Sequence, residues 1–303
     1  MKPAQHSAVK AARKHRHGAI STRCERARTV KRIVGDIVAK FPGLQLENLG
    51  KRHVLWWIDA MRRGKLSRGG RPPSIGSQKN DLAALRFLLR RIGKPNLLPK
   101  SNADLGVERR DCVRTVSVAM DLQPEQVAKI HAHSPRYAIC LQLMSEFGLR
   151  VEESLKIVPM MADRGFELEL RGSWCKNGRA RGIPILRTEQ RVILEQAKTI
   201  AGQGSLIPPG LNYAEARGQL QALTTAIGLN HRHALRHGYA ASRYLAMTGA
   251  LPPVATGLTR ADVTAEQVLL DRAARSAIAL ELGHARRSVL GAYLGSLFRS
   301  RRE

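Results

Sequence analysis

At the middle of this 303-residue chain, residues 148–153 read GLRVEE, the first of four segments that together indicate its architecture. Arg150 precedes Glu153 by three positions, so the two side chains can share one face of a helix. A guanidinium supported by a carboxylate is suited to binding two oxygens of one phosphate, because its planar donors match phosphate geometry and it stays charged. Judged alone, such a pair is more often a surface ion pair, so its significance depends on the other segments.

The second segment is a predicted β-hairpin that carries Lys176. Residues 166–171 alternate with a period of two, residues 181–185 suggest a second strand, and Asn177-Gly178 between them is a strong turn dipeptide. A lysine at a turn is usually solvated. A mobile hairpin, however, can bring an ammonium into a cleft, where it can donate a proton to a leaving oxygen.

The third and fourth segments read HALRH, residues 233–237, and LGH, residues 282–284. His233 and Arg236 are one helical turn apart, so they offer a second guanidinium and an imidazole that can accept a proton. His284 follows Gly283, which is typical of a helix end, and could donate another hydrogen bond to a phosphate. Each of these residues also has an ordinary explanation as a surface cation or a capping side chain.

Tyr293 lies nine positions after His284 in a short apolar stretch that predicts a helix. A phenol is protonated at neutral pH and is a poor nucleophile, but cations around a phosphate would help to activate it. The other tyrosines of this part of the chain lack a preceding turn and histidine. Six residues therefore form a set that could surround and attack one phosphate: Arg150, Lys176, His233, Arg236, His284 and Tyr293.

The charge of the chain favours a polyanionic partner. It has 51 Lys and Arg against 24 Asp and Glu, a net charge of +27, which fits DNA, RNA or an anionic membrane surface. Only 4% of the residues are aromatic, so stacking platforms for single strands are scarce and double-stranded DNA is the expected partner. There is no long uncharged apolar run for a membrane span and no secretory h-region, so we expect no membrane association and a cytoplasmic protein.

We expect no cofactor and no metal. The cysteines, at positions 24, 112, 140 and 175, are far apart and form no zinc-binding pattern. Carboxylates do not cluster near the basic segments, as a two-metal nuclease or transposase would require.

The chain divides into three predicted parts. Residues 1–20 are basic and low in apolar content, and predict a flexible arm. Residues 21–110 predict an all-helical module with a basic Gly/Pro-rich loop at 64–73. Residues 120–303 predict a larger, mainly α unit with one small antiparallel β-sheet. Its expected helices include 189–201, 213–227, 234–247 and 264–281, with capping boxes at two of their starts.

Residues 120–303 resemble the catalytic domain of tyrosine recombinases, the phage-type integrases, through GLR with Glu153, the Lys176 hairpin ending in Ile183-Pro184, HALRH, and LGH with Tyr293. The resemblance implies a tyrosine-recombinase catalytic fold preceded by an all-α, core-type DNA-binding domain, residues 21–110. It also implies a homo-tetramer on paired DNA sites and chemistry without metal or ATP.

The same resemblance implies a role for each residue. Tyr293 would form a 3′-phosphotyrosyl bond, Arg150 and Arg236 would hold the non-bridging oxygens, and Lys176 would be the general acid. His233 would be the base or proton relay, His284 would assist the phosphate, and Glu153 would orient Arg150. Further DNA contacts are expected from five cations: Arg68, Arg71, Lys79, Arg179 and Arg181.

The expected function is that of the integrase of a mobile element, in the nucleoid-associated cytoplasm of a bacterium. Three alternatives remain open: a type IB topoisomerase, a non-catalytic DNA-binding protein such as a repressor, and a structural RNA binder.

Two features depart from the family pattern. Arg236 and His284 are 48 positions apart, an excess that we place at residues 248–264. Only ten residues follow Tyr293. Family members often exchange a C-terminal helix between subunits, so we expect an unusual assembly geometry.

Overall fold

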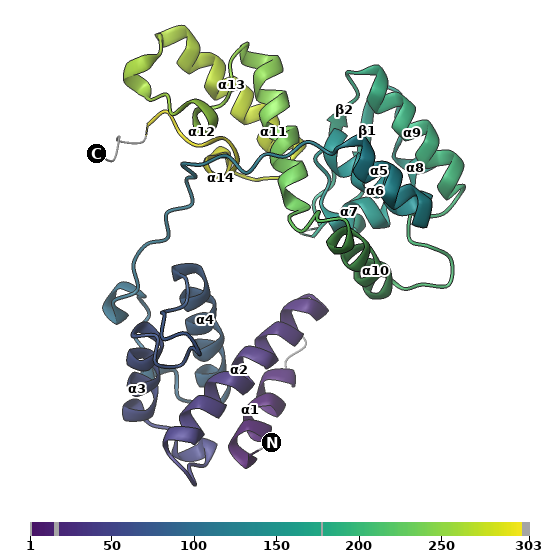
Figure 1. Cartoon of the computed structure of the whole chain (residues 1–303). Coiled ribbons are helices and arrows are strands. Elements are labelled where there is room, and N and C mark those ends of the chain that lie inside the picture. The colour runs from purple at the N-terminus through teal and green to yellow at the C-terminus, as the bar shows by residue number, and fades with distance from the viewer. Residues whose placement is uncertain (1, 15–17, 177, 299–303) are drawn as a thin grey trace. The chain divides into compact units, whose positions relative to one another are not determined.

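The computed structural model describes residues 2–14, 18–176 and 178–298 (Figure 1). The chain forms two compact units, residues 1–111 and 112–303. Each has its own hydrophobic core.

The described residues of the first unit form helices and no strand. Their bounds are α1 Pro3–Arg13, α2 Ile20–Lys40, η1 Leu46–Asn48, α3 Lys51–Arg62, α4 Ile75–Arg91, η2 Pro95–Leu97 and η3 Ala103–Leu105. Apolar residues recur at helical spacing in α2, at Val30, Ile33 and Ile37, and all three are buried. They pack with the fully buried Trp57 of α3, whose indole N–H donates to Asp36 over 3.1 Å. This core explains why the segment folds as a helical module.

Helix α1 corrects the prediction of a flexible arm at residues 1–20. Ala4, Ala8 and Ala12 are four residues apart and buried against α2 and α4, so α1 belongs to the core of the first unit. The low apolar content misled the prediction, because a stripe of alanines lets two helix backbones approach closely and needs no large side chain. The arm residues 1 and 15–17 lie outside the described residues.

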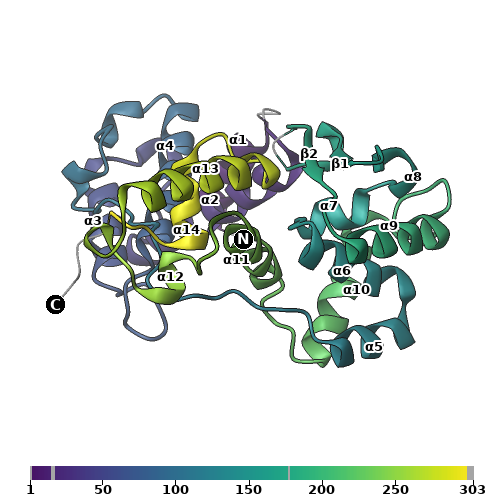
Figure 2. The ribbon, with the colours of Figure 1, turned by 90° about the horizontal axis from the view of Figure 1, so that it is seen from above.

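The second unit is mainly α with one small antiparallel sheet, as predicted. Its elements are α5 Pro124–His133, α6 Pro135–Glu146, α7 Val151–Lys156, α8 Pro159–Ala162, β1 Glu167–Leu170, η4 Gly172–Trp174, β2 Arg181–Pro184, α9 Thr188–Ala201, α10 Tyr213–Ala226, α11 His233–Thr248, α12 Pro253–Thr256, η5 Arg260–Asp262, α13 Ala265–Glu281, η6 Arg287–Leu290 and α14 Gly291–Leu294. The predicted capping boxes at Asn212 and Thr264 are present. Figures 1 and 2 show α11 between α13 and α14 on one side and the α5–α10 group on the other.

The strands β1 and β2 pair in the predicted antiparallel manner, with Glu167 opposite Pro184 and Leu170 opposite Arg181. The connection between them is longer than a tight hairpin and contains η4. Asn177 of the predicted turn lies outside the described residues, and Gly178 has a positive φ of 66°.

The predicted insertion at residues 248–264 contains α12 and η5 and supports the segment after Tyr293. The backbone N–H of Arg260 donates to the carbonyl of Leu297 over 2.7 Å. Gly295 has a φ of 70°, and a Cβ there would lie 2.8 Å from the backbone nitrogen of Val254. The insertion therefore packs closely against the chain that follows α14.

Candidate active site

The predicted nucleophile lies beside two of the predicted catalytic residues. Tyr293, on α14, is buried, and its hydroxyl accepts a hydrogen bond from Nε of Arg236 over 3.3 Å. The same hydroxyl is 3.4 Å from Nε2 of His233. The 3.6-residue period of α11 places His233 and Arg236 on the face toward α14. The structure thus brings together a phenol, a guanidinium and an imidazole from residues 57 and 60 positions apart.

Arg236 is fully buried and held from several sides. Its guanidinium donates to the carbonyls of Gly148 and Leu282, and it lies 3.9 Å from the Glu153 carboxylate. Burial lowers the pKa of Arg236 to about 10, although Tyr293 and Glu153 raise it in part. The side chain therefore stays charged at neutral pH with a fixed orientation.

Glu153 is at the centre of the cationic cluster and is fully buried. Its carboxylate accepts from both the backbone N–H of Arg150 and Nη1 of Arg150, each over 2.7 Å, which is the capping-box geometry at the start of α7. Burial alone would raise the pKa of Glu153, but hydrogen bonds and charges from Arg181 and Arg150 lower it to about 2. The carboxylate is ionised, and it holds Arg150 as predicted from the three-residue spacing.

Arg150 keeps an exposed edge. Its side chain is 21% exposed, and its Nη2 donates to the carbonyl of Leu282 over 3.2 Å. The carbonyl of Leu282, at the C-terminal end of α13, thus orients both Arg150 and Arg236. Because helix C-terminal carbonyls carry partial negative charge, they favour this gathering of cations.

Arg181 corrects a prediction, because it is not placed as an exposed DNA contact. Its side chain is 6% exposed and pairs with Glu153 over 2.8 Å. It also donates from Nε to the carbonyl of Glu281 over 2.7 Å. A DNA contact requires an exposed cation, whereas Glu153 gives Arg181 a partner in the interior of the unit.

His237 is a member of the site that the sequence reasoning did not single out. Its ring is stacked on the ring of Tyr293, with centroids 4.4 Å apart and an interplanar angle of 26°. It also meets His233 edge to face at 5.2 Å. Burial, followed by the charges of His233, Arg114 and Arg236, lowers the pKa of His237 to about 4. Its position four residues after His233, on the same helix face, was the available signal.

The rings of His233 and His284 also lie close to Tyr293. His284 lies with its centroid 5.6 Å from that of Tyr293. Burial and the nearby arginines lower the pKa of His284 to about 4, and desolvation followed by Arg236 and Arg150 lowers the pKa of His233. The buried Nε2 of His284 and Nδ1 of His237 make no hydrogen bond to any residue that the structure describes. Neutral imidazoles with free nitrogens are suited to accept or donate one hydrogen bond to an incoming group.

The remaining predicted cations are at the surface or close to it. Lys176 is exposed on the β1–β2 connection, and no hydrogen bond or ion pair joins it to Tyr293 or to another described member of the site. Arg179 is exposed on the same connection. In the first unit, Arg68 and Arg71 are exposed and Lys79 is half-buried.

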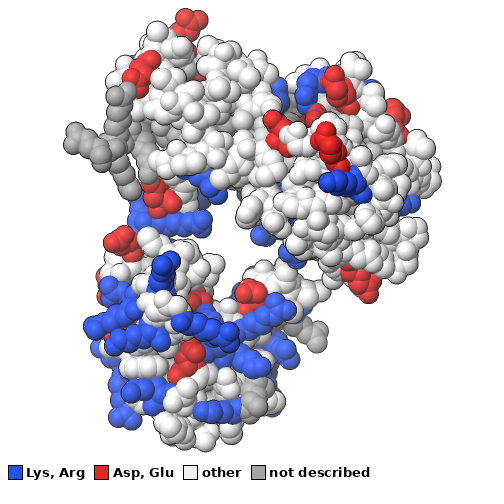
Figure 3. Space-filling model, viewed as in Figure 1, with Lys and Arg blue, Asp and Glu red and all other residues white. Residues whose placement is uncertain are grey.

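Charge is concentrated in the first unit. Residues 1–111 contain 26 Lys and Arg against 8 Asp and Glu, a net charge of +18 out of +27. Figure 3 shows Lys and Arg spread over the surface of this unit. The second unit carries the remaining +9 over 192 residues, and its site arginines are largely buried.

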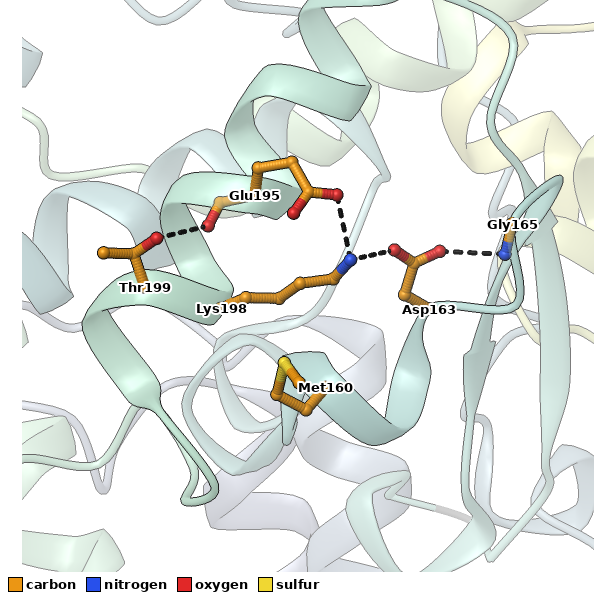
Figure 4. A pocket seen from close by; sticks show the side chains of 6 residues that line it. All are labelled: Met160, Asp163, Gly165, Glu195, Lys198 and Thr199. Carbon is orange, nitrogen blue, oxygen red and sulfur yellow. Dashed lines mark hydrogen bonds and ion pairs between the residues drawn. The ribbon is translucent and has the colours of Figure 1, made fainter.

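Of two cavities in the second unit, one is lined by residues of the Tyr293 site and the other is not. One, of about 710 Å³, is lined by His233 and His237 together with Arg114 and other residues of the 114–120 and 230–234 segments. In the other, of about 540 Å³, Lys198 pairs with both Asp163 and Glu195 (Figure 4). Its polar groups already have partners, and none of its lining residues belongs to the Tyr293 site.

Among the residues described, no group of three His, Cys, Asp or Glu is placed to hold a metal ion. None of the described helices combines the length and apolar character needed to span a membrane.

Comparison with solved structures identifies the fold. A lambda integrase dimer bound to a COC′ core site matches with a TM-score of 0.58 and 16% identity, over 98% of this chain and 79% of that chain. A lambda integrase(75-356) dimer bound to a COC′ core site matches with 0.56 and 17%, over 93% and 96%. A lambda integrase tetramer bound to a Holliday junction matches with 0.52 and 18%, over 78% and 69%. The chain has the tyrosine recombinase fold, as the sequence resemblance predicted. No protein-family model and no curated protein matches it.

Proposed function

We propose that this chain is a site-specific DNA recombinase that cuts and rejoins duplex DNA through a tyrosine ester. The observation that carries the proposal is the Tyr293 hydroxyl, 3.3 Å from Nε of Arg236 and 3.4 Å from Nε2 of His233. A nucleophile, a fixed cation and a proton acceptor converge there on one atom, in a fold shared with lambda integrase.

In the proposed reaction, the Tyr293 oxygen attacks the scissile phosphorus. The new bond joins phosphorus to the phenolic oxygen, and the bond from phosphorus to the 5′ oxygen breaks. The phenol proton passes to Nε2 of His233, which can accept it because its lowered pKa favours the neutral ring. Lys176 supplies a proton to the departing 5′ oxygen. The exposed position of Lys176 leaves its ammonium free to approach bound DNA.

Transition-state stabilisation is assigned to Arg150 and Arg236. Charge accumulates on the non-bridging oxygens of the five-coordinate phosphorus, and preorganised donors lower its energy without reorganising. Both guanidiniums are preorganised by Glu153 and by the carbonyl of Leu282. His284 would add a further hydrogen bond through its free Nε2.

The first unit is proposed as a clamp on the DNA backbone. Its net charge of +18 suits phosphate binding, and the exposed Arg68 and Arg71 lie in a loop with little other structure. Arg179 and Lys79 are proposed as additional contacts. The lambda integrase structures contain dimers and a tetramer, so we propose a homo-tetramer on paired sites. Integration or excision of a mobile element in a bacterial cytoplasm is the proposed setting.

Covalent capture tests the proposal. The full chain is incubated with sheared genomic DNA from its source organism, adducts resistant to SDS are isolated, and the joined DNA ends are sequenced. We expect one recurrent site with the protein on a 3′ phosphate, and cleavage that persists in EDTA. Tyr293→Phe removes only the hydroxyl, so the adduct should disappear while DNA affinity stays within about twofold of the wild type.

The outcomes separate the alternatives. An adduct that survives in Tyr293→Phe means that another residue is the nucleophile. Adducts spread over unrelated sequences, with plasmid relaxation and no recombinants, indicate a topoisomerase. Binding without any adduct indicates a non-catalytic DNA-binding protein, and a preference for RNA indicates a structural RNA binder.

A further inference from the structure

Arg181, the first residue of β2, contacts three separate elements that each carry or adjoin a candidate catalytic residue. Its guanidinium reaches Glu153 on α7, the end of α13 and Cys175 in the β1–β2 connection. With 6% of its side chain exposed, it does so from the interior of the unit.

The strongest of these contacts fixes the carboxylate that holds Arg150. Oε1 of Glu153 accepts from Nη1 of Arg150 over 2.7 Å and from Nη1 of Arg181 over 3.1 Å. Oε2 accepts from the backbone N–H of Arg150 over 2.7 Å and from Nη2 of Arg181 over 2.8 Å. Each oxygen is therefore shared between the two arginines, so the carboxylate cannot rotate without losing a bond to each. The orientation of Arg150 depends in this way on Arg181.

The second contact reaches the turn before His284. Nε of Arg181 donates to the carbonyl of Glu281 over 2.7 Å, one residue before the Leu282 carbonyl that accepts from Arg150 and Arg236. A Cβ at Gly283 would lie 3.0 Å from Nη1 of Arg181, and the φ of Gly283 is 66°. The glycine thus supplies both the turn and the space that the guanidinium occupies.

The third contact is weaker. Nη1 of Arg181 lies 3.4 Å from Sγ of Cys175, the residue before Lys176. It ties the base of the connection to the same guanidinium, while the Lys176 side chain remains exposed. We therefore place the main effect of Arg181 on the phosphate-binding arginines.

We propose that Arg181 is a positioning residue for strand cleavage, which acts through Glu153 to orient Arg150 and through the end of α13 to orient Arg236 and His284, without contacting DNA. This inference rests on the proposed recombinase function. Lysine cannot replace arginine fully, because one ammonium cannot pair with both carboxylate oxygens and reach Glu281 in the same geometry.

The test compares two substrates at the mapped cleavage site: the ordinary phosphodiester and a methylphosphonate at the scissile position. The methylphosphonate lacks the charge on a non-bridging oxygen, so its cleavage depends less on the guanidiniums. We expect Arg181→Ala to slow adduct formation about 100-fold on the phosphodiester, the scale of a small misplacement of catalytic groups. On the methylphosphonate, Arg181→Ala should be less than about tenfold slower than the wild type. Arg181→Lys should recover part of the phosphodiester rate.

Arg164→Ala is the matched control, because Arg164 pairs with Glu169 on the same sheet but is half exposed. It should leave both rates and the DNA affinity unchanged. Equal deficits on both substrates would show that Arg181 is merely structural and overturn the inference, as would an unchanged phosphodiester rate. Weakened DNA binding with a smaller salt dependence would make Arg181 a DNA contact. If the wild-type chain forms no adduct on either substrate, the proposed function is overturned as well. If the wild-type chain forms the adduct and Arg181→Ala forms it at the same rate, only the inference is overturned.

Discussion

Glu153→Gln should destabilise the second unit at neutral pH, by an amount that follows from its environment. The pKa of Glu153 falls from an ordinary 4.5 to about 2 in the folded chain. Each factor of ten in proton affinity is worth ~1.4 kcal/mol, so the ionised carboxylate contributes about 3 kcal/mol to the free energy of unfolding. The amide keeps the shape but carries no charge, and its NH₂ group would face the donors of Arg150 and Arg181.

The pH dependence has a defined sign. The folded pKa of Glu153 lies below the unfolded value, so its stabilisation is fully present above about pH 4.5 and is lost as the pH falls toward 2. The difference in unfolding free energy between the wild type and Glu153→Gln should therefore be largest at pH 7 and should decrease between pH 4.5 and 2.

The difference in unfolding free energy is measured by urea unfolding of the full chain. Hydrogen exchange of the amides in α7 and α13 serves as the probe, so the second unit is measured separately from the first. Glu169→Gln is the control. Its carboxylate pairs with Arg164 at the surface, where an ion pair is worth less than ~1 kcal/mol. A loss in Glu153→Gln no larger than in the control, or one that is the same at pH 3 and pH 7, would refute this account of the buried cluster.

Three further predictions concern other parts of the chain. His237→Ala should slow adduct formation at least tenfold, whereas His237→Phe should retain more of the rate, because phenylalanine preserves the stacking on Tyr293. Rapid-quench cleavage assays compare the two variants, and equal rates would contradict the stacking role. Ala8→Leu should destabilise the first unit by about 1–3 kcal/mol through overpacking, measured by urea unfolding, whereas no loss would favour a free arm. The double variant Arg68→Ala/Arg71→Ala should weaken DNA binding and reduce the steepness of log affinity against log salt by up to about 2, as measured in filter-binding titrations. An unchanged slope would exclude both residues as phosphate contacts.

The sequence could predict the parts of the site that local periodicity determines. Arg150 and Glu153 are joined by a helix start, and His233 and Arg236 by one turn of α11, so their pairing follows from spacing. The approach of His233 and Arg236 to Tyr293 depends on the packing of α11 against α14, and no local spacing determines it. The structure supplies the distances that make this convergence explicit.

Burial accounts for what the sequence could not predict. Arg181 is predicted as a DNA contact, because nothing local indicates that Glu153, 28 positions away, accepts from it in the interior. The segment of α1 is predicted as a flexible arm, because its buried face consists of alanines. In both cases a long-range partner determines the environment of a residue whose own type suggests exposure.

The buried charges around Glu153 leave an excess of positive charge that a phosphate would balance. Arg150, Arg181 and Arg236 surround one carboxylate, Glu153, so the cluster carries a net charge of +2. The lowered pKa values of His233, His237 and His284 keep these rings neutral at pH 7, so they add no charge to the excess. A five-coordinate phosphodiester transition state carries two negative charges, one more than its ground state. A site with this excess and with fixed donors would therefore favour the transition state over the bound substrate, which is the condition for rate acceleration.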